Sequence, residues 1–238
     1  MITLFFNQVD STQNIAKSIA EKTSDEFAVI ARQQISGRGR RGRSWFSPLG
    51  GLYISIVFRK VKCLRLTSLA VAALIANFLE KEFKVNVKVK WPNDILINNK
   101  KIGGILCEAS IKGNKLEYII IGIGLNVNIP RELFPIEFRS NTISLIEIVN
   151  SGDLNLEEIA GKLINEIIYV KDWNCNEILI KWLKYDCTIG RKVEVISDNI
   201  RFTGIARGID FDGSLIIELS SGERLKINSS NYTIRILS

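Results

Sequence analysis

Four strand-like segments with very short connections, between residues 87 and 123, constrain the fold of this chain more than any other feature. They are Val87–Trp91, Asp94–Ile97, Ile102–Glu108 and Leu116–Ile123. The pairs Asn98-Asn99 and Gly113-Asn114 are typical of tight turns, so successive segments are expected to form antiparallel hairpins. The sequence therefore predicts an α+β fold built around a mixed, largely antiparallel sheet.

Other segments predict strands and helices that extend and flank this sheet. Strands are expected at Ile2–Phe6, Ala28–Gln33 and Leu52–Phe58, and helices directly after Asp10-Ser11-Thr12 and at Leu66–Phe83, Leu156–Trp173 and Glu177–Tyr185. The strongest helix is Leu66–Phe83, because apolar residues recur in it at steps of three and four. Residues Pro130–Thr142 contain two of the four prolines and little periodicity, which predicts a long mobile loop.

From Thr188 onward the pattern changes to short strands separated by frequent turns. Five strands are expected, at Val193–Ser197, Arg201–Ile209, Ser214–Leu219, Glu223–Ile227 and Tyr232–Leu237. The turns between them are predicted at Asp198-Asn199, Asp212-Gly213 and Ser221-Gly222. So many short strands in about 50 residues indicate a small SH3-like β-barrel. We therefore expect two domains, residues 1–187 and residues 188–238.

The 238 residues include no histidine. This excludes a Ser-His-Asp triad, a Cys-His pair and an HExxH zinc site, and leaves proton transfer to lysines, carboxylates or substrate groups. The four cysteines, Cys63, Cys107, Cys175 and Cys187, show no CxxC spacing, which disfavours a zinc cluster. Each lies in an apolar or mixed segment, so we expect buried, reduced thiols.

Neither a membrane span nor a signal peptide is expected. No apolar run approaches the roughly 18 to 20 residues that a membrane-spanning helix requires. Met1 is followed directly by a strand-like segment, without the basic region and cleavage pattern of a signal peptide. The sequence therefore predicts a soluble, cytoplasmic protein.

The basic character of the chain is local. The formal net charge is +7, but four arginines within six residues, Arg38, Arg40, Arg41 and Arg43, supply much of it. Without them the balance would be unremarkable. The question is therefore which anion this short segment binds.

These arginines lie in the segment Gly37–Trp45, GRGRRGRSW. Its glycines let the backbone approach a ligand and expose N–H groups, while arginine forks match phosphate or carboxylate groups. The segment is neither a Walker A loop nor a dinucleotide-binding GxGxxG, because SWFSP follows the arginines instead of a helix. An RGG-like nucleic-acid contact stays open, although the position between two strands weakens that interpretation.

The segment Lys90-Trp91-Pro92-Asn93-Asp94 places five different side chains at a bend between two expected strands. Its lysine could meet a phosphate, and its amide and carboxylate could bind a divalent cation or a ribose hydroxyl. Lone residues of these types on strands are usually solvated surface groups. Their concentration at one bend favours a binding site.

Two glycine-containing strands complete the set of motifs. In KIGGIL, which begins at Lys101, paired glycines inside an apolar strand indicate close approach of a ligand or backbone, although a simple hairpin kink explains them equally well. In GIGLNVN, which begins at Gly122, the glycines alone are weak evidence. Asn126 and Asn128 alternate with apolar neighbours and could face one pocket.

Taken in order, these motifs resemble those of the biotin–protein ligases, also called holocarboxylase synthetases. The resemblance rests on DSTQN, on Gln34 with GRGRRGRSW, and on KWPND, KIGGIL-x-E and GIGLNVN, and it extends over the whole chain. It implies a catalytic domain like that of lipoate–biotin ligases and class II synthetases, followed by a small β domain. Many bacterial members begin with a winged-helix DNA-binding domain. Here the first catalytic strand is expected at residue 2, so we expect a short form without it.

The resemblance implies a two-step reaction. Biotin and ATP would form biotinyl-5′-adenylate and pyrophosphate, and a lysine of a biotin carboxyl carrier domain would then receive the biotinyl group. Because a carboxylate must attack the α-phosphorus of a polyanion, preformed cations and backbone N–H groups suit this chemistry without histidine. Mg²⁺ bound to the phosphates is expected for the same reason. The resemblance also implies a homodimer.

The functional residues of the family carry over onto matching positions. The biotin-binding set is Ser11, Thr12, Gln13, Gln34, Gly37, Arg38, Gly39, Arg40, Lys101 and Gly104. The set for ATP and adenylate is Arg38, Arg40, Arg41, Gly42, Arg43, Trp45, Lys90, Asn93, Asp94, Lys101 and Asn126. Lys101 and Arg40 are expected to be catalytic, and Asp94 is the candidate metal ligand. Pro130–Thr142 corresponds to a loop that orders over the adenylate.

Two alternatives stay open from the sequence. A lipoate–protein ligase is similar in fold and also adenylates an acid, but usually shows a histidine-containing motif after its arginine–glycine loop. A nucleic-acid-binding module using Arg38–Arg43 would bind oligonucleotides with strong salt dependence. That second interpretation leaves the KWPND and KIGG motifs unexplained.

Overall fold

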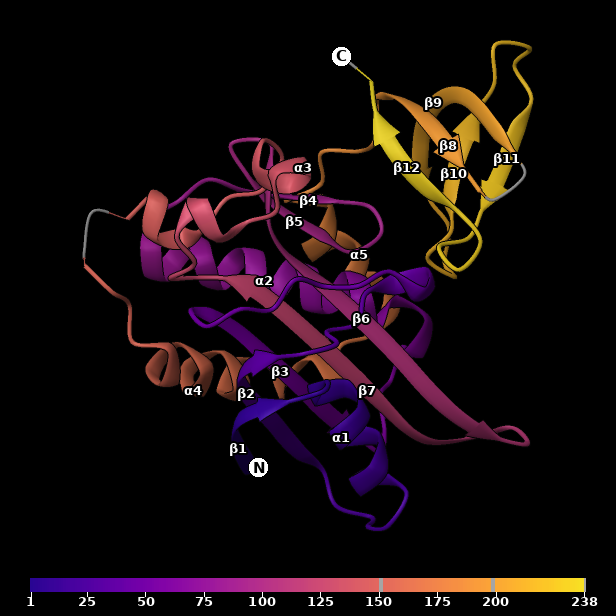
Figure 1. The fold of residues 1–238 in the computed structure, drawn as a ribbon. Helices are drawn as coiled ribbons and strands as arrows, with labels where there is room; N and C mark the ends of the chain where they lie inside the picture. Colours follow the sequence, from indigo (N-terminus) through magenta and orange to yellow (C-terminus); the bar gives the residue numbers. More distant parts are fainter. Residues whose placement is uncertain (150–151, 198–199, 238) are drawn as a thin grey trace.

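The computed structural model describes residues 1–149, 152–197 and 200–237. The predicted turn at Asp198-Asn199 and the last residue of the second predicted domain lie outside the described residues. Within them, the chain forms one seven-stranded sheet, one five-stranded sheet and the helices that pack against the larger sheet (Figure 1).

The larger sheet has the strand order β1-β2-β3-β7-β6-β5-β4 in the described ranges. Its strands are β1 (Ile2–Val9), β2 (Phe27–Gln34), β3 (Gly51–Phe58), β4 (Val87–Lys90), β5 (Asp94–Ile97), β6 (Lys100–Lys112) and β7 (Lys115–Asn126). β1 and β2 are parallel because helix α1 (Thr12–Ala20) crosses between them. The other neighbouring pairs are antiparallel. The predicted mixed, largely antiparallel sheet is confirmed.

The predicted hairpins form where the turn residues placed them. Asn98 and Asn99 adopt φ angles of 52° and 59°, the left-handed backbone that a tight two-residue hairpin turn requires. Gly113, between β6 and β7, has φ 59°. These turns bring the KWPND and KIGG motifs onto neighbouring strands, with Asp94 of β5 opposite Gly104 of β6.

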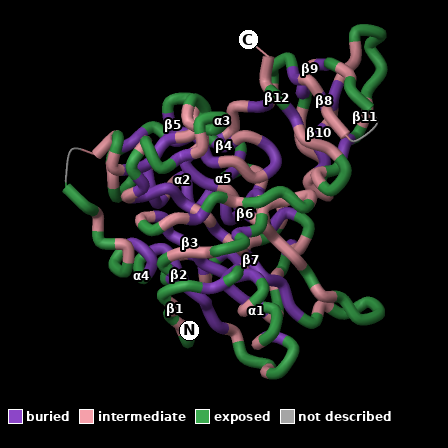
Figure 2. The backbone as a smooth tube through the Cα atoms, viewed as in Figure 1, coloured by how far each residue is buried: buried purple, intermediate pink, exposed green. Residues whose placement is uncertain are grey.

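The two faces of the sheet are covered by different helices. α2 (Thr67–Phe83), α4 (Leu156–Ile167) and α5 (Cys175–Leu183) pack on one face, and α1 packs on the other (Figure 1). Adjacent residues of β3 alternate accordingly, so that Ile56 joins the larger core and Val57 the smaller one under α1. Buried segments concentrate between helices and sheet, whereas the far end of the β6–β7 hairpin is exposed (Figure 2).

The predicted helices are present, with shifted ends. The helix expected at Leu156–Trp173 stops at Ile167 and is followed by a short 3-10 helix, Val170–Asp172. α5 begins at Cys175 because Asn174 caps it, and the Asn174 and Glu177 side chains each accept a hydrogen bond from the other residue's backbone N–H.

The long loop expected at residues 130–142 is interrupted by helical turns. It contains the 3-10 helix Arg131–Leu133 and the short helix α3 (Ile136–Arg139), and a further 3-10 helix, Leu145–Glu147, follows. The prediction of one continuous loop was therefore wrong. Both helical turns start directly after a proline, a residue whose fixed φ suits the first position before a helix.

Two of the cysteines form a disulfide, which corrects the expectation of four reduced thiols. Cys63 and Cys175 are bonded across a sequence separation of 112 residues. They join the turn before α2 to the first residue of α5. Cys107 and Cys187 are free thiols of intermediate burial. The spacing of the cysteines along the chain carries no signal for a bond between elements so far apart.

The last 50 residues form the smaller sheet, which is antiparallel with the order β11-β10-β9-β8-β12 in the described residues. Its strands are β8 (Lys192–Ile196), β9 (Arg201–Ile209), β10 (Leu215–Glu218), β11 (Arg224–Ile227) and β12 (Thr233–Ile236). The five predicted strands are confirmed. β11 and β12 are the two edges of this sheet, and barrel closure stays a prediction.

The two sheets are joined through the KWPND segment. The backbone N–H of Trp91 donates to Thr188 Oγ1 at 2.9 Å, and its indole Nε1 donates to the carbonyl of Gly213 at 3.0 Å. Trp91 is fully buried. This tryptophan therefore links the bend that carries Asn93 and Asp94 to the C-terminal sheet. None of the helices in the described residues has the length and apolar character to cross a bilayer.

Candidate active site

One end of the candidate site is a network of buried polar side chains at the start of α1. Gln34 Oε1 accepts hydrogen bonds from the backbone N–H and the hydroxyl of Thr12, at 2.8 and 3.1 Å. The hydroxyl of Ser55 lies 2.9 Å from Thr12 Oγ1 and 3.0 Å from Gln13 Oε1. Ser11 caps the helix and is also buried. These groups form a hydrogen-bonding wall inside an otherwise apolar sheet.

The arginine–glycine segment forms a folded loop above this wall. A β-bridge joins Arg38 to Ser44, and the Gly39 N–H donates to the carbonyl of Arg43 at 2.7 Å. The backbone is left-handed at Arg41 and Gly42, with φ 58° and 71°. A non-glycine residue in that conformation costs about 1 to 2 kcal/mol, and such strain is typical of functional loops.

Arg40 extends from the loop to the KWPND bend. Its Nη1 donates to Asn93 Oδ1 at 3.1 Å, and Asn93 in turn donates to the carbonyl of Ile105 at 2.7 Å. Burial lowers the pKa of the Arg40 guanidinium and nearby Arg43 lowers it further, while Asp94 raises it. Its Nη2 is buried and has no hydrogen-bond partner in the described part of the chain. A buried charged donor without a partner is a strong candidate for a ligand contact.

Asp94 lies between two lysines. Its Oδ1 is 2.5 Å from Lys101 Nζ, and its Oδ2 is 3.0 Å from Lys90 Nζ. Burial favours the neutral acid, but the two ammonium groups outweigh it and hold the pKa of Asp94 below its usual value. The carboxylate therefore stays ionised at neutral pH and fixes the position of both lysines.

The paired glycines of β6 and β7 provide room for Trp45. Gly104 and Gly124 face each other on neighbouring strands. A Cβ at these positions would lie 3.3 Å and 2.5 Å from atoms of the Trp45 indole. Lys101 Nζ lies 5.1 Å from the centre of the same ring. A close approach is present at Gly104 and Gly124, but the group that approaches is the indole side chain of Trp45, not the ligand or backbone that the glycines indicated.

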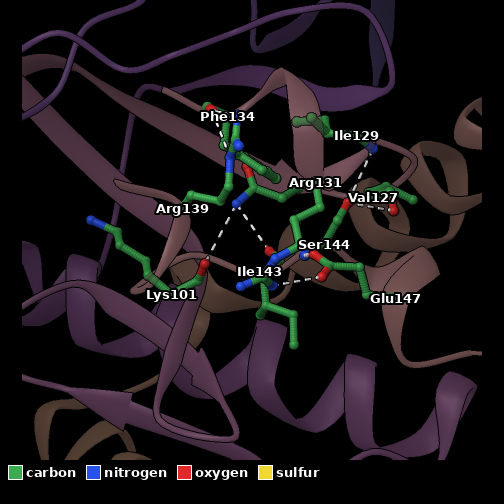
Figure 3. A network of polar contacts seen from close by, with 10 residues as sticks. Lys101, Val127, Ile129, Arg131, Phe134, Arg139, Ile143, Ser144 and Glu147 are labelled. Carbon is green, nitrogen blue, oxygen red and sulfur yellow. Dashed lines mark hydrogen bonds and ion pairs between the residues drawn. The ribbon is translucent and has the colours of Figure 1, made fainter. Parts of the chain in front are cut away.

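The backbone of Lys101 is bonded to the segment that contains Asn141 and Ile143, and Figure 3 shows Lys101 beside the polar network of Ile143, Ser144 and Glu147. The Lys101 N–H donates to the carbonyl of Asn141 at 2.8 Å, and the Ile143 N–H donates to the Lys101 carbonyl at 3.0 Å. Ser144 and Glu147 then tie this segment to itself through a capping box. The main chain of Lys101 is therefore held in place independently of the contacts that its side chain makes.

Most of the predicted site residues line one cavity. Those that do are Ser11, Thr12, Gln13, Gln34, Arg38, Gly39, Arg40, Arg41, Arg43, Trp45, Lys90, Asn93, Asp94, Lys101 and Gly104. Three predicted residues are not part of this lining. Gly37 packs against Ser47 and the Trp45 carbonyl, Gly42 is at the outer turn of the loop, and Asn126 donates to the carbonyl of Ile143 at 3.1 Å. Their roles in binding stay predictions.

Several residues of the lining were not predicted from the sequence. Ser55 is the one polar residue of the apolar strand LYISIVF, and this isolation was a usable signal. Thr233 and Ile234 of β12 reach the same cavity from the smaller sheet. Nothing in the local sequence of β12 indicates this, because the approach depends on how the two sheets pack.

The charge of the lining is strongly one-sided. Six cationic side chains contribute to it, namely Arg38, Arg40, Arg41, Arg43, Lys90 and Lys101. Asp94 is the single acidic residue among the described residues that line the cavity. Outside the masked positions, no group of three or more acidic or cysteine side chains is arranged to hold a metal ion. The cavity therefore suits a multiply charged anion next to a neutral polar group.

Two family models place this fold in a class of enzymes that ligate biotin or lipoate to protein. The model of the biotin/lipoate A/B protein ligase family matches residues 5–126, and that of the biotin protein ligase C-terminal domain matches residues 188–231. The chain belongs to the biotin–protein ligase family.

Known relatives resemble the chain over nearly all of its length. The bifunctional ligase/repressor BirA of Bacillus subtilis is 32% identical over 240 residues, covering 97% of this chain and 73% of that protein. The biotin–[acetyl-CoA-carboxylase] ligase of Paracoccus denitrificans is 28% identical over 231 residues, covering 92% and 95%. The biotin protein ligase of Aquifex aeolicus in complex with biotin and ATP superposes with a TM-score of 0.82 at 28% identity, covering 99% of each chain.

Proposed function

We propose that this protein is an ATP-dependent ligase that activates biotin as biotinyl-5′-adenylate and transfers it to a lysine of a biotin carboxyl carrier domain. The main support for this proposal is the cavity, in which a hydrogen-bonding wall lies next to six cationic side chains. The wall matches a neutral ureido ring, and the cations match a carboxylate and a triphosphate.

In the first step, an oxygen of the biotin carboxylate attacks the α-phosphorus of ATP, and the bond from that phosphorus to the leaving pyrophosphate breaks. Negative charge accumulates where two anions meet. Lys101 and the unpartnered Nη2 of Arg40 are the donors that stabilise it, because both are held in place before the substrates bind. Arg41 and Arg43 bind the outer phosphates, and Trp45 packs on the bound acid or nucleotide.

Mg²⁺ would be bound mainly by the phosphates of ATP, where it would supply charge neutralisation. Asp94 is the carboxylate of the lining that would hold it, since Mg²⁺ is commonly bound by one carboxylate together with phosphate oxygens and water. Both oxygens of Asp94 contact lysines, so Lys90 or Lys101 would have to give up one of these contacts for the ion to bind there.

In the second step, the amine of the acceptor lysine attacks the acyl carbon of the adenylate, an amide bond forms and AMP leaves. The acceptor is a biotin carboxyl carrier domain of a carboxylase. This assignment is supported by the relative of Paracoccus denitrificans, which is named for ligation to acetyl-CoA carboxylase. No histidine is needed, because the adenylate is already an activated acyl group.

The geometry does not favour the alternatives. The arginines of the loop line the same cavity as the buried polar wall, and a nucleic-acid contact through the loop would leave that wall and the Asp94–Lys101 pair without a role. Lipoate ligation shares the first family model, but the second model, which matches residues 188–231, is that of biotin protein ligases.

The same proposal includes the domain organisation, the cellular location and the oligomeric state of the enzyme. Residues 1–187 form the catalytic domain and residues 188–238 an SH3-like domain, whose residues Thr233 and Ile234 reach the cavity. The enzyme acts in the cytoplasm as a homodimer. Size-exclusion chromatography with light scattering tests the dimer directly.

The function is tested by intact mass spectrometry of a biotin carboxyl carrier domain incubated with the protein, biotin, ATP and Mg²⁺. We expect a mass gain equal to one biotinyl group, lost when ATP is left out and not reproduced with lipoate. A folded, monodisperse sample that modifies the carrier domain with neither acid would refute the proposal.

A further inference from the structure

Arg38, the first arginine of the loop, makes a bidentate contact with a residue that does not line the cavity. Its Nη2 lies 2.7 Å from Glu108 Oε1, and its Nη1 lies 3.1 Å from Glu108 Oε2. The same Nη1 is 3.1 Å from Asn14 Oδ1. Parallel fork contacts of this kind fix the direction of a guanidinium as well as binding it.

The three residues come from three separate parts of the fold. Asn14 lies on α1, Glu108 on β6, and Arg38 in the loop. β5 pairs with β6 only as far as Gly104, so Glu108 lies beyond the end of β5. The loop covers β6 at this point, and Arg38 is its contact there. The loop also contacts the body through Arg40, to Asn93, and through Trp45, which packs on Gly104 and Gly124.

We propose that Glu108, with Asn14, anchors Arg38 and thereby holds the arginine–glycine loop over the cavity, which makes Glu108 a positioning residue for ligand retention. Arg38 lines the cavity while Glu108 does not, so Glu108 acts through Arg38. The Arg38 and Glu108 side chains are 39% and 38% exposed, so the anchor can open and close without breaking the core.

The role of Glu108 in turnover rests on the proposed function, but the anchor itself does not. When the contact is lost, the loop keeps its Arg40 and Trp45 contacts, and its Arg38 end samples open positions. Biotin and the adenylate then leave more easily, while the reacting groups around Lys101 stay unchanged. We therefore expect Glu108→Ala to raise KM for biotin by up to about five-fold and to leave kcat unchanged within the error of the assay, the scale of one ion pair at a half-exposed site.

The anchor is tested without ligand by limited trypsin digestion of the full-length protein. Trypsin cleaves faster after Arg40 and Arg41, which are half-buried, when the loop leaves the body, and mass spectrometry identifies those cuts. We expect Glu108→Ala to accelerate them about ten-fold, and Glu108→Gln, which keeps one acceptor oxygen, to give an intermediate rate. The matched control is Glu117→Gln on the same hairpin, where the carboxylate bonds only to Ser110 in the described structure.

Unchanged cleavage in the loop for Glu108→Ala, with unchanged thermal unfolding, overturns the anchor. Faster cleavage with an unchanged KM for biotin overturns the positioning role. Faster cleavage in a protein that never biotinylates a carrier domain supports the anchor and refutes the proposed function instead. The two proposals therefore fail through different measurements.

Discussion

Replacement of Lys101 by alanine is the most direct test of how the cavity catalyses adenylation. The Lys101 ammonium is held 2.5 Å from Asp94 Oδ1 and 5.1 Å from the centre of the Trp45 ring. It is oriented before any substrate binds, so it needs no reorganisation as charge develops on phosphorus. Removing one such preorganised donor lowers kcat by about 10²- to 10³-fold, or about 2.7 to 4 kcal/mol.

The same change should affect stability little. The Lys101 side chain is 33% exposed, and an ion pair at such a site contributes about 0 to 1 kcal/mol to the free energy of unfolding. The main-chain bonds of Lys101 to Asn141 and Ile143 do not depend on the side chain. Asp94 also keeps its second partner, Lys90. A loss of activity would therefore report chemistry instead of folding.

The assay is the exchange of labelled pyrophosphate into ATP at saturating biotin, which isolates the adenylation step. Lys90→Ala is the matched control, because it removes the other lysine that contacts Asp94. We expect a loss of at least 10² in kcat for Lys101→Ala and a smaller loss for Lys90→Ala. A rate for Lys101→Ala within about three-fold of wild type would remove Lys101 from the reaction centre.

Other changes have equally definite outcomes. Arg40→Gly should speed release of biotinyl-adenylate, because it removes the buried Nη2 and the contact to the KWPND bend; unchanged retention in a filter assay would exclude that role. Reduction of the Cys63–Cys175 bond should lower the melting temperature by about 10 °C, because the bond closes a long loop and contributes about 4 to 5 kcal/mol to the free energy of unfolding. Calorimetry with and without reductant measures this shift. Burial opposes ionisation of Asp94, but its two lysine partners outweigh burial and lower its pKa. The loss of stability caused by Asp94→Asn should therefore be complete at neutral pH and should diminish below about pH 4, where the native carboxylate becomes protonated. A difference in melting temperature that does not change with pH contradicts the ion pair. Biotin with ATP should raise the melting temperature by more than the sum of their separate effects, because the adenylate is retained; additive shifts in differential scanning fluorimetry argue against an adenylate.

Local sequence rules predicted the features that depend on a few neighbouring residues. Asn98-Asn99 and Gly113 set the hairpin turns through their left-handed backbone, and the turns in turn brought Asp94 opposite Gly104. The glycines of KIGG indicated a close approach for a local reason, since only a residue without Cβ leaves room there. These turn and glycine patterns depend only on neighbouring residues, so they can be interpreted without knowing which distant segments pack against them.

Features made by distant elements could not be predicted in this way. The Cys63–Cys175 bond and the Arg38–Glu108 contact join residues 112 and 70 positions apart. Asn126 alternates with apolar neighbours as a pocket residue would, yet its amide bonds to the carbonyl of Ile143. A polar residue between apolar neighbours can either face a binding pocket or bond to a neighbouring backbone, and which of the two occurs depends on the segment that packs against the strand.

The placement of the acidic residues explains how a cavity so rich in cations remains folded and still binds anions. Six like charges around one cavity repel one another, and folding requires some of that repulsion to be offset. Asp94 pairs with two lysines from within and offsets one of their two charges, and Glu108 binds Arg38 from outside the lining. Neither carboxylate contacts Arg40 within the described structure, and its Nη2 stays without a partner. The acids therefore orient cations of the cavity and leave Arg40 Nη2 as the donor that, under the proposed function, would meet the substrate where the charge of the reaction develops.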